Sequence, residues 1–245
     1  MLRSKAADTL EEVARLSEPQ YLVFDADDTL WDSQTHFFAA FEEFVAACVE
    51  AECLLERELI RETVFRAELE LIESIGYGRR PYVNALLRAA EQIAAPEKLQ
   101  GLQADIEDIG RRLIDCHCEL LPGVADTLAD LADRHTLLMF TKGQRDEQLE
   151  KLRHSGLESL FTRVETPREK DVDAYRRLVL DAELEPERTW MIGNSPRSDI
   201  NPAVRAGLGA VYIPSAHTWE LEREELSSHQ RIVEIDEFRR LLDLF

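Results

Sequence analysis

Apolar positions along the chain change their spacing twice, and each change marks a boundary. A short apolar run, YLVF, begins at Tyr21 and has the length of a buried strand. Between residues 33 and 119 the apolar residues recur at helical spacing, which is typical of amphipathic helices. From about residue 120, short apolar runs alternate with helical patterns. The pattern predicts one strand, then a block of helices, then an alternating α/β region.

The block 33–119 is predicted to hold four helices. Gly76 ends the second, and Pro81 fits the first turn of the third, where the missing amide hydrogen is tolerated. Arg79 and Arg80 stand at the start of the third helix and are expected to be solvated, with contact to a substrate phosphate as the alternative. The four predicted helices cover about residues 36–55, 58–76, 79–93 and 96–117.

The alternating region predicts a mainly parallel sheet, because strand and helix follow one another through short connections. Predicted strands lie at about 136–140, 161–165, 189–194 and 209–214, with helices at about 124–132, 144–154, 171–184 and 198–207. Segments 231–235 and 236–245 close the chain. The sequence thus predicts an α/β core formed by 1–32 and 120–245, interrupted by an all-helical insert at 33–119.

Composition narrows the possible partners. The net charge of −20 argues against a nucleic acid polymer, because binding one depends on releasing its counterions to basic residues. No apolar run approaches the length that a membrane span needs, so no membrane partner is expected. Residues 1–16 form a polar amphipathic pattern without a secretory signal, which predicts a cytoplasmic location. Oligomeric state cannot be deduced from these features.

The four cysteines predict neither disulfides nor a zinc site. A long chain without a secretory signal favours reduced thiols. The run Cys116-His117-Cys118 lacks the second ligand pair that structural zinc sites need nearby. We therefore interpret it as the end of a helix with small buried thiols.

Polar side chains follow the predicted strands at the edge of the sheet where parallel α/β proteins bind ligands. Carboxylates, a hydroxyl, a lysine and an amide converge there, and this inventory suits a divalent metal with a phosphoryl group. The residues are Asp25 and Asp27 after the first strand, Thr141, Lys142 and Gly143 after the second, Lys170 after the third, and Asn194 and Asp199 after the fourth.

Each residue type has a chemical reason to be there. Residues i and i+2 of an extended chain point the same way, so Asp25 and Asp27 can face one site while Asp28 faces away. A carboxylate can attack phosphorus to give an aspartyl-phosphate, and a second one can donate and then accept a proton. Thr141 can donate to a phosphoryl oxygen, and Lys170 can offset its charge and hold Asp25 ionised.

Four motifs in order make the chain resemble the phosphatase type of the haloacid dehalogenase superfamily, with a helical cap inserted after the first motif. They are DADDTL at Asp25, the strand LLMF ending in Thr141, Lys170 opening a helix, and the loop MIGNSPRSD. The resemblance implies a Rossmann-like core, a cap over the site, and a Mg²⁺-dependent phosphohydrolase acting on a small phosphorylated metabolite. It implies Asp25 as nucleophile and Asp27 as acid and base.

The resemblance also implies the metal ligands. They are a side-chain oxygen of Asp25, the backbone carbonyl of Asp27 and an oxygen of the fourth motif. Many members have an aspartate where Asn194 stands, so Asn194 binds Mg²⁺ weakly or Asp199 does so, directly or through water. Lys170 precedes Asp171 where the family often has proline, which leaves Lys142 as a competitor for its role.

Two other functions compete with the phosphatase. A 2-haloacid dehalogenase uses the first aspartate but needs neither Mg²⁺ nor a second catalytic carboxylate, so Asp27 argues against it. A non-catalytic binder of phosphorylated ligands is favoured by Asn194 and opposed by the complete set of Asp25, Asp27, Thr141 and Lys170.

Overall fold

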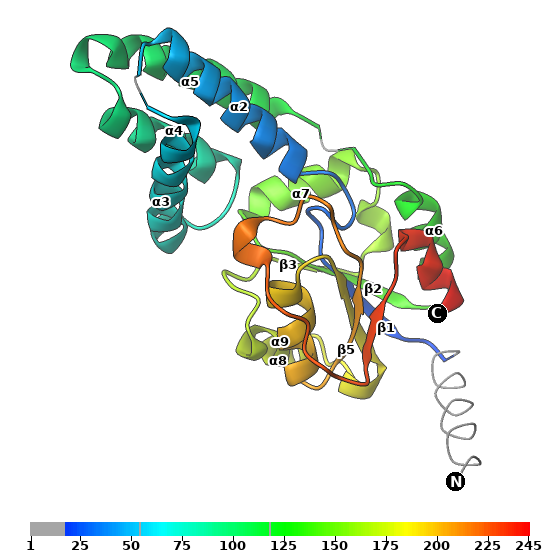
Figure 1. Ribbon diagram of the computed structural model, residues 1–245. Helices are drawn as coiled ribbons and strands as arrows, with labels where there is room; N and C mark the ends of the chain where they lie inside the picture. Colours follow the sequence, from blue (N-terminus) through cyan, green and yellow to red (C-terminus); the bar gives the residue numbers. More distant parts are fainter. Residues whose placement is uncertain (1–17, 54, 118) are drawn as a thin grey trace. The chain divides into compact units, whose positions relative to one another are not determined.

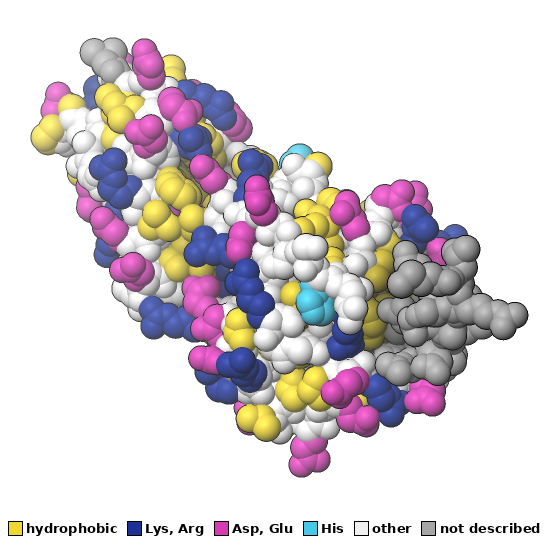
Figure 2. Space-filling view, turned by 60° about the horizontal axis from the view of Figure 1, so that its bottom comes forward, with side chains coloured by type: hydrophobic (Ala, Val, Ile, Leu, Met, Phe, Trp, Pro, Cys, Tyr) yellow, Lys and Arg dark blue, Asp and Glu magenta, His cyan; other side chains and the backbone are white. Residues whose placement is uncertain are grey.

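The computed structural model describes residues 18–53, 55–117 and 119–245. The predicted helix at 1–16 lies outside these residues. The chain divides into two compact units: the first unit is formed by the residues up to Asp32 together with those after His117, and the second unit by Ser33–His117. No helix in the described ranges is long and apolar enough to cross a membrane. In the face shown in Figure 2, acidic and basic side chains are interspersed.

The sheet of the first unit is six-stranded and parallel, in the order β3-β2-β1-β4-β5-β6 (Figure 1). This confirms the α/β class and the Rossmann-type topology. β1 is central, since it pairs with both β2 and β4. The strands are β1 Tyr21–Phe24, β2 Thr136–Phe140, β3 Arg163–Glu165, β4 Thr189–Gly193, β5 Gly209–Tyr212 and β6 Ile232–Glu234.

Helices cover both faces of this sheet, because alternate strand residues point to opposite sides. Leu22 and Phe24 pack in one buried cluster with α6 and η5, whereas Val23 packs in another with α8 and α9. Every residue of β1 after Tyr21 is therefore buried. The helices of this unit are α6 Val124–Ala132, α7 Arg145–His154, α8 Val172–Asp181 and α9 Asn201–Arg205, with the 3₁₀ segment η5 at Phe238–Asp243.

The second unit is entirely helical where it is described. Its core is formed by apolar residues at helical spacing, including Phe44, Ile60, Leu86 and Ile106. Its helices are α2 Gln34–Glu50, α3 Arg57–Ile75, α4 Arg79–Ile93 and α5 Pro96–Asp115. The four predicted helices are thus present; α4 has the predicted ends, and the ends of the other three differ from the predicted ranges by at most five residues.

The prediction that Arg79 is solvated is wrong. It was expected to be solvated, but it is only 6% exposed. Its guanidinium donates hydrogen bonds to the carbonyl oxygens of Ile114 (3.0 Å) and Cys116 (2.9 Å) at the end of α5. Helix ends leave carbonyl groups without intrahelical partners, so a buried arginine there is a structural clamp within the helical unit.

The predicted helix 198–207 is also different in the structure. A single π turn covers Pro196–Ile200, and α9 follows it. The cause is Ser195, whose carbonyl oxygen accepts hydrogen bonds from the amides of both Asp199 (2.9 Å) and Ile200 (3.1 Å). The wide turn keeps this part of the loop close to the end of β4.

The two segments through which the chain leaves the first unit and returns to it are paired with each other. Trp31 and Leu120 form an antiparallel bridge, and the amide of Asp32 donates to the carbonyl of Glu119 at 2.9 Å. The amide of Leu121 donates to the carbonyl of Leu30, also at 2.9 Å. The helical unit is therefore inserted through a paired, two-stranded joint.

Candidate active site

Asp25 stands at the end of the central strand, in a nearly closed environment. Its amide donates to the carbonyl of Ile192 at 2.9 Å, which extends the pairing of β1 with β4 by one residue. The residue is 7% exposed. One carboxylate oxygen, Oδ2, accepts from the Thr29 hydroxyl at 3.2 Å. A buried carboxylate is costly unless it is paired, so its partners define the site.

Lys170 is the main partner of Asp25. Its ammonium donates to Asp25 Oδ1 and, at 2.6 Å, to Asp199 Oδ1. Lys170 is 4% exposed and Asp199 is 1% exposed. The other oxygen of Asp199 accepts from the backbone amide of Ser195 at 2.9 Å. Residues far apart in the sequence thus form a buried carboxylate–ammonium–carboxylate cluster, as the strand-end argument predicted.

The electrostatics of this cluster are dominated by burial. Burial raises the pKa of Asp25 above its ordinary value, despite the opposing effect of Lys170. Burial likewise raises the pKa of Asp199. Burial lowers the pKa of Lys170, but the charges of Asp199 and Asp25 outweigh it and raise the pKa overall. One ammonium therefore compensates two carboxylates incompletely.

Asn194 lies next to this cluster. Its side-chain Oδ1 accepts from the Thr29 hydroxyl at 3.2 Å, and the same hydroxyl reaches Asp25 Oδ2 at 3.2 Å. Because a hydroxyl has one proton, it is shared between the two oxygens, which converge on it. Gly193 leaves room for the Asp199 carboxylate of the cluster, since a Cβ at residue 193 would lie 2.2 Å from Asp199 Oδ2.

Asp27 has its own set of partners. Its Oδ1 accepts from the Trp31 indole at 2.7 Å and from the Lys151 ammonium at 2.9 Å, and its Oδ2 accepts from the Gln148 amide at 2.8 Å. Burial pushes the pKa of Asp27 up, but Lys151 and the hydrogen bonds outweigh it, so the pKa is lowered. The charge of Asp27 also helps to raise the pKa of Asp25, so the two carboxylates are electrostatic neighbours.

Thr141 and Lys142, which follow β2, both have polar partners within the protein. Thr141 is 1% exposed, and its hydroxyl lies 3.3 Å from the carbonyl oxygen of Lys142. The Lys142 ammonium forms an ion pair with Glu222 and lies 3.9 Å from Glu169. Glu222 also accepts from the Ser195 hydroxyl at 2.6 Å. Lys142 thus has carboxylate partners of its own, which the sequence did not indicate.

Four contributing residues were not singled out from the sequence: Trp31, Gln148, Lys151 and Glu222. Gln148 and Lys151 are one helical turn apart on α7, directly after the loop that holds Thr141, and both are buried. A polar pair on the inner face of a helix beside a site is a signal that could have been noticed. Nothing comparable marks Glu222, which lies in the short 3₁₀ segment η4, Glu220–Glu222, after β5.

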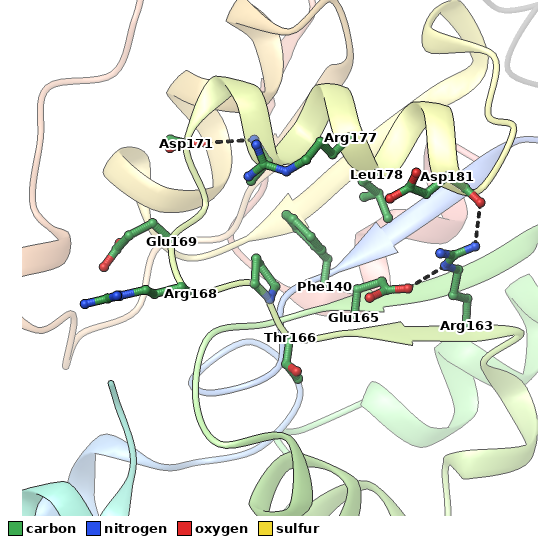
Figure 3. A pocket seen from close by; sticks show the side chains of 12 residues that line it. Phe140, Arg163, Glu165, Thr166, Arg168, Glu169, Asp171, Arg177, Leu178 and Asp181 are labelled. Atoms are coloured by element: carbon green, nitrogen blue, oxygen red, sulfur yellow. Dashed lines mark hydrogen bonds and ion pairs between the residues drawn. The ribbon is translucent and has the colours of Figure 1, made fainter. Parts of the chain in front are cut away.

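A separate pocket of about 430 Å³ opens beside β3 and α8 (Figure 3). Phe140 and Leu178 contribute apolar surface, while Arg163 donates to Glu165 at 2.7 Å and to the carbonyl of Asp181 at 2.7 Å. Its lining includes Arg168 and Glu169, just before Lys170, but none of Asp25, Asp27 or Asn194. The pocket is therefore distinct from the aspartate cluster.

The donor set of the cluster fits a magnesium ion. Asp25 and Asn194 present hard oxygen atoms to the same hydroxyl, and such oxygens suit Mg²⁺. The incomplete compensation of Asp25 and Asp199 by one ammonium also favours a further cation. Among the described residues no group of three or more His, Cys, Asp and Glu side chains is arranged as a metal site. An Mg²⁺ site here would therefore include an amide or backbone oxygen.

The fold and the site define a class before any comparison is made. A parallel sheet of this strand order, with paired aspartates after the central strand and a helical insert that follows them in the sequence, is a Rossmann-type protein with a carboxylate site. The chain belongs to the haloacid dehalogenase-like hydrolases, which match it over residues 20–207. This confirms the resemblance inferred from the four motifs.

The proteins to which this chain is similar differ in the activities that their names give. The chain is 26% identical over 228 residues to a glyceraldehyde 3-phosphate phosphatase of Methanothermobacter thermautotrophicus, covering 90% of this chain and 97% of the relative. A haloacid dehalogenase-like hydrolase from Xanthomonas campestris has a TM-score of 0.74 at 28% identity, covering 89% and 87% of the two chains. A 2-haloacid dehalogenase from Pseudomonas syringae has a TM-score of 0.62 at 20% identity, covering 92% and 97%, and shows the shared fold.

Proposed function

We propose that this hydrolase is a Mg²⁺-dependent phosphatase that cleaves small phosphate monoesters through an aspartyl-phosphate on Asp25. The observation that carries the proposal is the buried cluster of Asp25, Lys170 and Asp199. A second carboxylate, that of Asp27, stands two residues after Asp25 in the sequence. Family membership and the phosphatase among its relatives support it. A cytoplasmic location is part of the same proposal.

The reaction proceeds in two steps. A carboxylate oxygen of Asp25 attacks phosphorus, the P–O bond to the leaving group breaks, and the leaving oxygen takes a proton from Asp27. A water oxygen then attacks phosphorus, Asp27 takes a proton from that water, and the P–O bond to Asp25 breaks. Inorganic phosphate leaves, and both aspartates return to their starting states.

Lys170 and Thr141 support the transferred group. The buried ammonium of Lys170 keeps Asp25 ionised for attack and offsets charge on the phosphoryl oxygens. The Thr141 hydroxyl, whose bond within the protein is long at 3.3 Å, turns to donate to a phosphoryl oxygen. Lys142 and Gly143 complete the phosphate site, with Lys142 exchanging Glu222 for the substrate.

Asp25, the backbone carbonyl of Asp27 and Asn194 would hold Mg²⁺. Asn194 is the better candidate of the two residues in the fourth motif, because both oxygens of Asp199 already accept bonds from Lys170 and Ser195. Asp199 then acts on the site by orienting Lys170. When bound, the ion supplies positive charge that offsets the repulsion between the phosphoryl group and the carboxylates.

We propose that the helical unit serves as a cap that selects the substrate. The chain leaves the core just after Asp25 and Asp27, and returns through the joint at Leu120. A cap that closes over its site excludes water and favours small substrates. The relative with glyceraldehyde 3-phosphate activity makes triose phosphates the first substrates to test, followed by sugar phosphates and nucleoside monophosphates.

The test is phosphate release from an aryl phosphate and from this substrate panel, with Mg²⁺ and with a chelator. We expect turnover that requires Mg²⁺ and is abolished in Asp25→Asn. Ligand binding without turnover over the whole panel would instead favour the non-catalytic binder.

The dehalogenase alternative rests on fold similarity to a 2-haloacid dehalogenase. A halide leaves without a proton, so that reaction has no use for the carboxylate of Asp27, which this chain holds with three donors. Halide release from 2-haloacids in the presence of a chelator, unaffected by Asp27→Asn, would favour it over the phosphatase.

A further inference from the structure

The turn that ends α2 brings two cysteines together. The amide of Glu52 donates to the carbonyl of Val49 at 3.0 Å, and the amide of Cys53 donates to the carbonyl of Cys48 at 2.9 Å. Glu52 has a φ of 58°, in the left-handed region. These two hydrogen bonds around one left-handed residue form a Schellman motif, with which many helices end. Cys48 and Cys53 occupy the two positions of the motif whose side chains commonly touch.

The backbone hydrogen bond between the two cysteines limits their separation. With standard bond lengths, a distance of 2.9 Å from the Cys53 nitrogen to the Cys48 carbonyl oxygen keeps the two Cα atoms within about 7 Å of each other. Two cysteines whose Cα atoms are more than about 7 Å apart cannot be bridged without movement of the backbone. The turn therefore places this pair within the range of a disulfide.

The two side chains face each other as well. Burial is the largest cause that raises the pKa of the Cys48 thiol to about 12, and the neighbouring Cys53 thiol adds to this rise. Cys48 belongs to the apolar core of the helical unit, and Cys53 packs against that core. Both cysteines are free thiols in the structure.

The two thiols differ in their access to solvent. Cys48 is completely buried, whereas Cys53 is partly exposed. The ammonium of Lys98, on α5, lies 2.9 Å from the Glu52 carboxylate. Glu52 raises the pKa of Lys98, and Cys53 contributes to the rise, so this ammonium is an electrostatic neighbour of Cys53. Cys53 is therefore the thiol that meets a reagent from solution, with positive charge close by.

We propose that Cys48 and Cys53 form a dithiol modification site, which reacts with low-molecular-weight disulfides such as oxidised glutathione to give an internal disulfide. The site is independent of the proposed phosphatase reaction, because none of its residues belongs to the aspartate cluster. Its reactivity follows from the geometry of one helix end and requires no metal or cofactor.

The modification proceeds by two thiol–disulfide exchanges. The thiolate of Cys53 attacks one sulfur of oxidised glutathione, an S–S bond forms between them, and the first glutathione leaves. Cys48 then loses its proton and attacks the Cys53 sulfur, and the second glutathione leaves. The two cysteines are oxidised by two electrons, the reagent is reduced to two thiols, and the two thiol protons end on the two glutathione molecules. An excess of reduced glutathione reverses both steps.

The test treats the full-length protein with oxidised glutathione and analyses its peptides by mass spectrometry. A glutamate-specific protease cleaves after Glu50 and Glu52, between the two cysteines, so their peptides stay together only if a disulfide joins them. The wild type should lose two hydrogen atoms and give one linked pair of peptides, residues 44–50 and 53–56. Excess reduced glutathione should separate this pair.

Three variants assign the steps. Cys48→Ser should stop at the mixed disulfide, so that Cys53 keeps one glutathione. Cys53→Ser should leave Cys48 unmodified, because the buried thiol does not meet the reagent. Cys116→Ser is the matched control, since it removes a partly exposed thiol at the end of α5 and should still form the linked pair.

The wild-type result decides the proposal, and it does not depend on the folding of any variant. Glutathione retained on Cys53 without a link to Cys48 would overturn the proposal. A link from Cys53 to any other cysteine would do the same. The proposal is equally wrong if Cys48 and Cys53 both stay reduced at an excess of oxidised glutathione that modifies Cys116.

Discussion

Asn194 is the residue at which this chain departs most clearly from the aspartate common in the family's fourth motif. Its amide oxygen shares the Thr29 hydroxyl with Asp25, so in the proposed Mg²⁺ site it would be a ligand that supplies no negative charge. A neutral ligand binds a divalent cation less tightly than a carboxylate. The Mg²⁺ concentration that the proposed enzyme requires should therefore depend in part on this one residue.

Asn194→Asp should tighten Mg²⁺ binding by about tenfold, which corresponds to about 1.4 kcal/mol. The measurement is the Mg²⁺ concentration that gives half-maximal phosphate release. Gln230→Glu, which adds the same charge at an exposed position, is the control and should leave it unchanged. An unchanged titration in Asn194→Asp would mean that residue 194 is not a ligand.

Elements position the site through a few close approaches. β4 ends at Gly193, and the Asp199 carboxylate packs against this glycine in the space that a Cβ at residue 193 would occupy. The turn after it exists because Ser195 accepts two backbone amides. The sequence pattern suggested an ordinary helix here, since periodicity does not register a wide turn of one or two residues.

Gly193→Ala should displace Asp199, lower phosphatase activity strongly and destabilise the fold by roughly 1–3 kcal/mol. The comparison is Gly101→Ala in α5, where a Cβ meets nothing within 4 Å. That change should stabilise the protein by about 0.5–1 kcal/mol, because alanine favours a helix. Urea unfolding of the two variants should give changes of opposite sign in the free energy of unfolding. An unchanged free energy of unfolding in Gly193→Ala would contradict the close approach.

His135 connects elements at the other end of the sheet. Its Nδ1 accepts from the Gln20 amide at 3.0 Å, and its Nε2 lies 3.3 Å from the carbonyl oxygen of Phe245. Burial lowers the pKa of His135 below the ordinary 6.5, although the Phe245 carbonyl opposes this. Protonation at Nδ1 would place a proton against the Gln20 amide, so the folded state prefers the neutral ring.

The sign of the resulting pH dependence follows from linkage. Below pH 6.5 the unfolded chain binds the proton before the folded one, so stability is fully present above that pH and falls as the pH drops toward the lowered folded pKa. The free energy of unfolding should decrease between pH 7.5 and pH 5.5, and less so in His135→Asn. Identical pH dependence in both proteins would show that His135 does not contribute.

At the scale of the whole molecule, the sequence predicted the architecture well because its signals are long. Apolar runs and helical periodicity extend over many residues, so the fold class and the order of elements could be predicted from them. Asp25, Lys170 and Asp199 could be brought together from topology alone, since parallel strands end at one edge. Side-chain pairings across the fold could not be predicted, because Lys142 with Glu222 and Asp27 with Lys151 depend on tertiary packing.

The burial of Arg79 shows the same limit. Two adjacent arginines at a helix start are usually solvated, and only the packing of α4 against α5 decides that Arg79 turns inward to the carbonyls of Ile114 and Cys116. Local sequence thus predicts elements and strand-end chemistry, while the partners that tune this chemistry are fixed by the fold.

The central claim is that Asp25 becomes phosphorylated, and the most direct measurement is to trap that species. Enzyme turning over an aryl phosphate with Mg²⁺ is quenched in acid, digested and analysed by mass spectrometry. The account predicts that the peptide containing Asp25 gains one phosphoryl group at Asp25, and that Asp25→Asn gains none while still folding. Turnover without a phosphorylated Asp25 peptide, or turnover that survives Asp25→Asn, would contradict it.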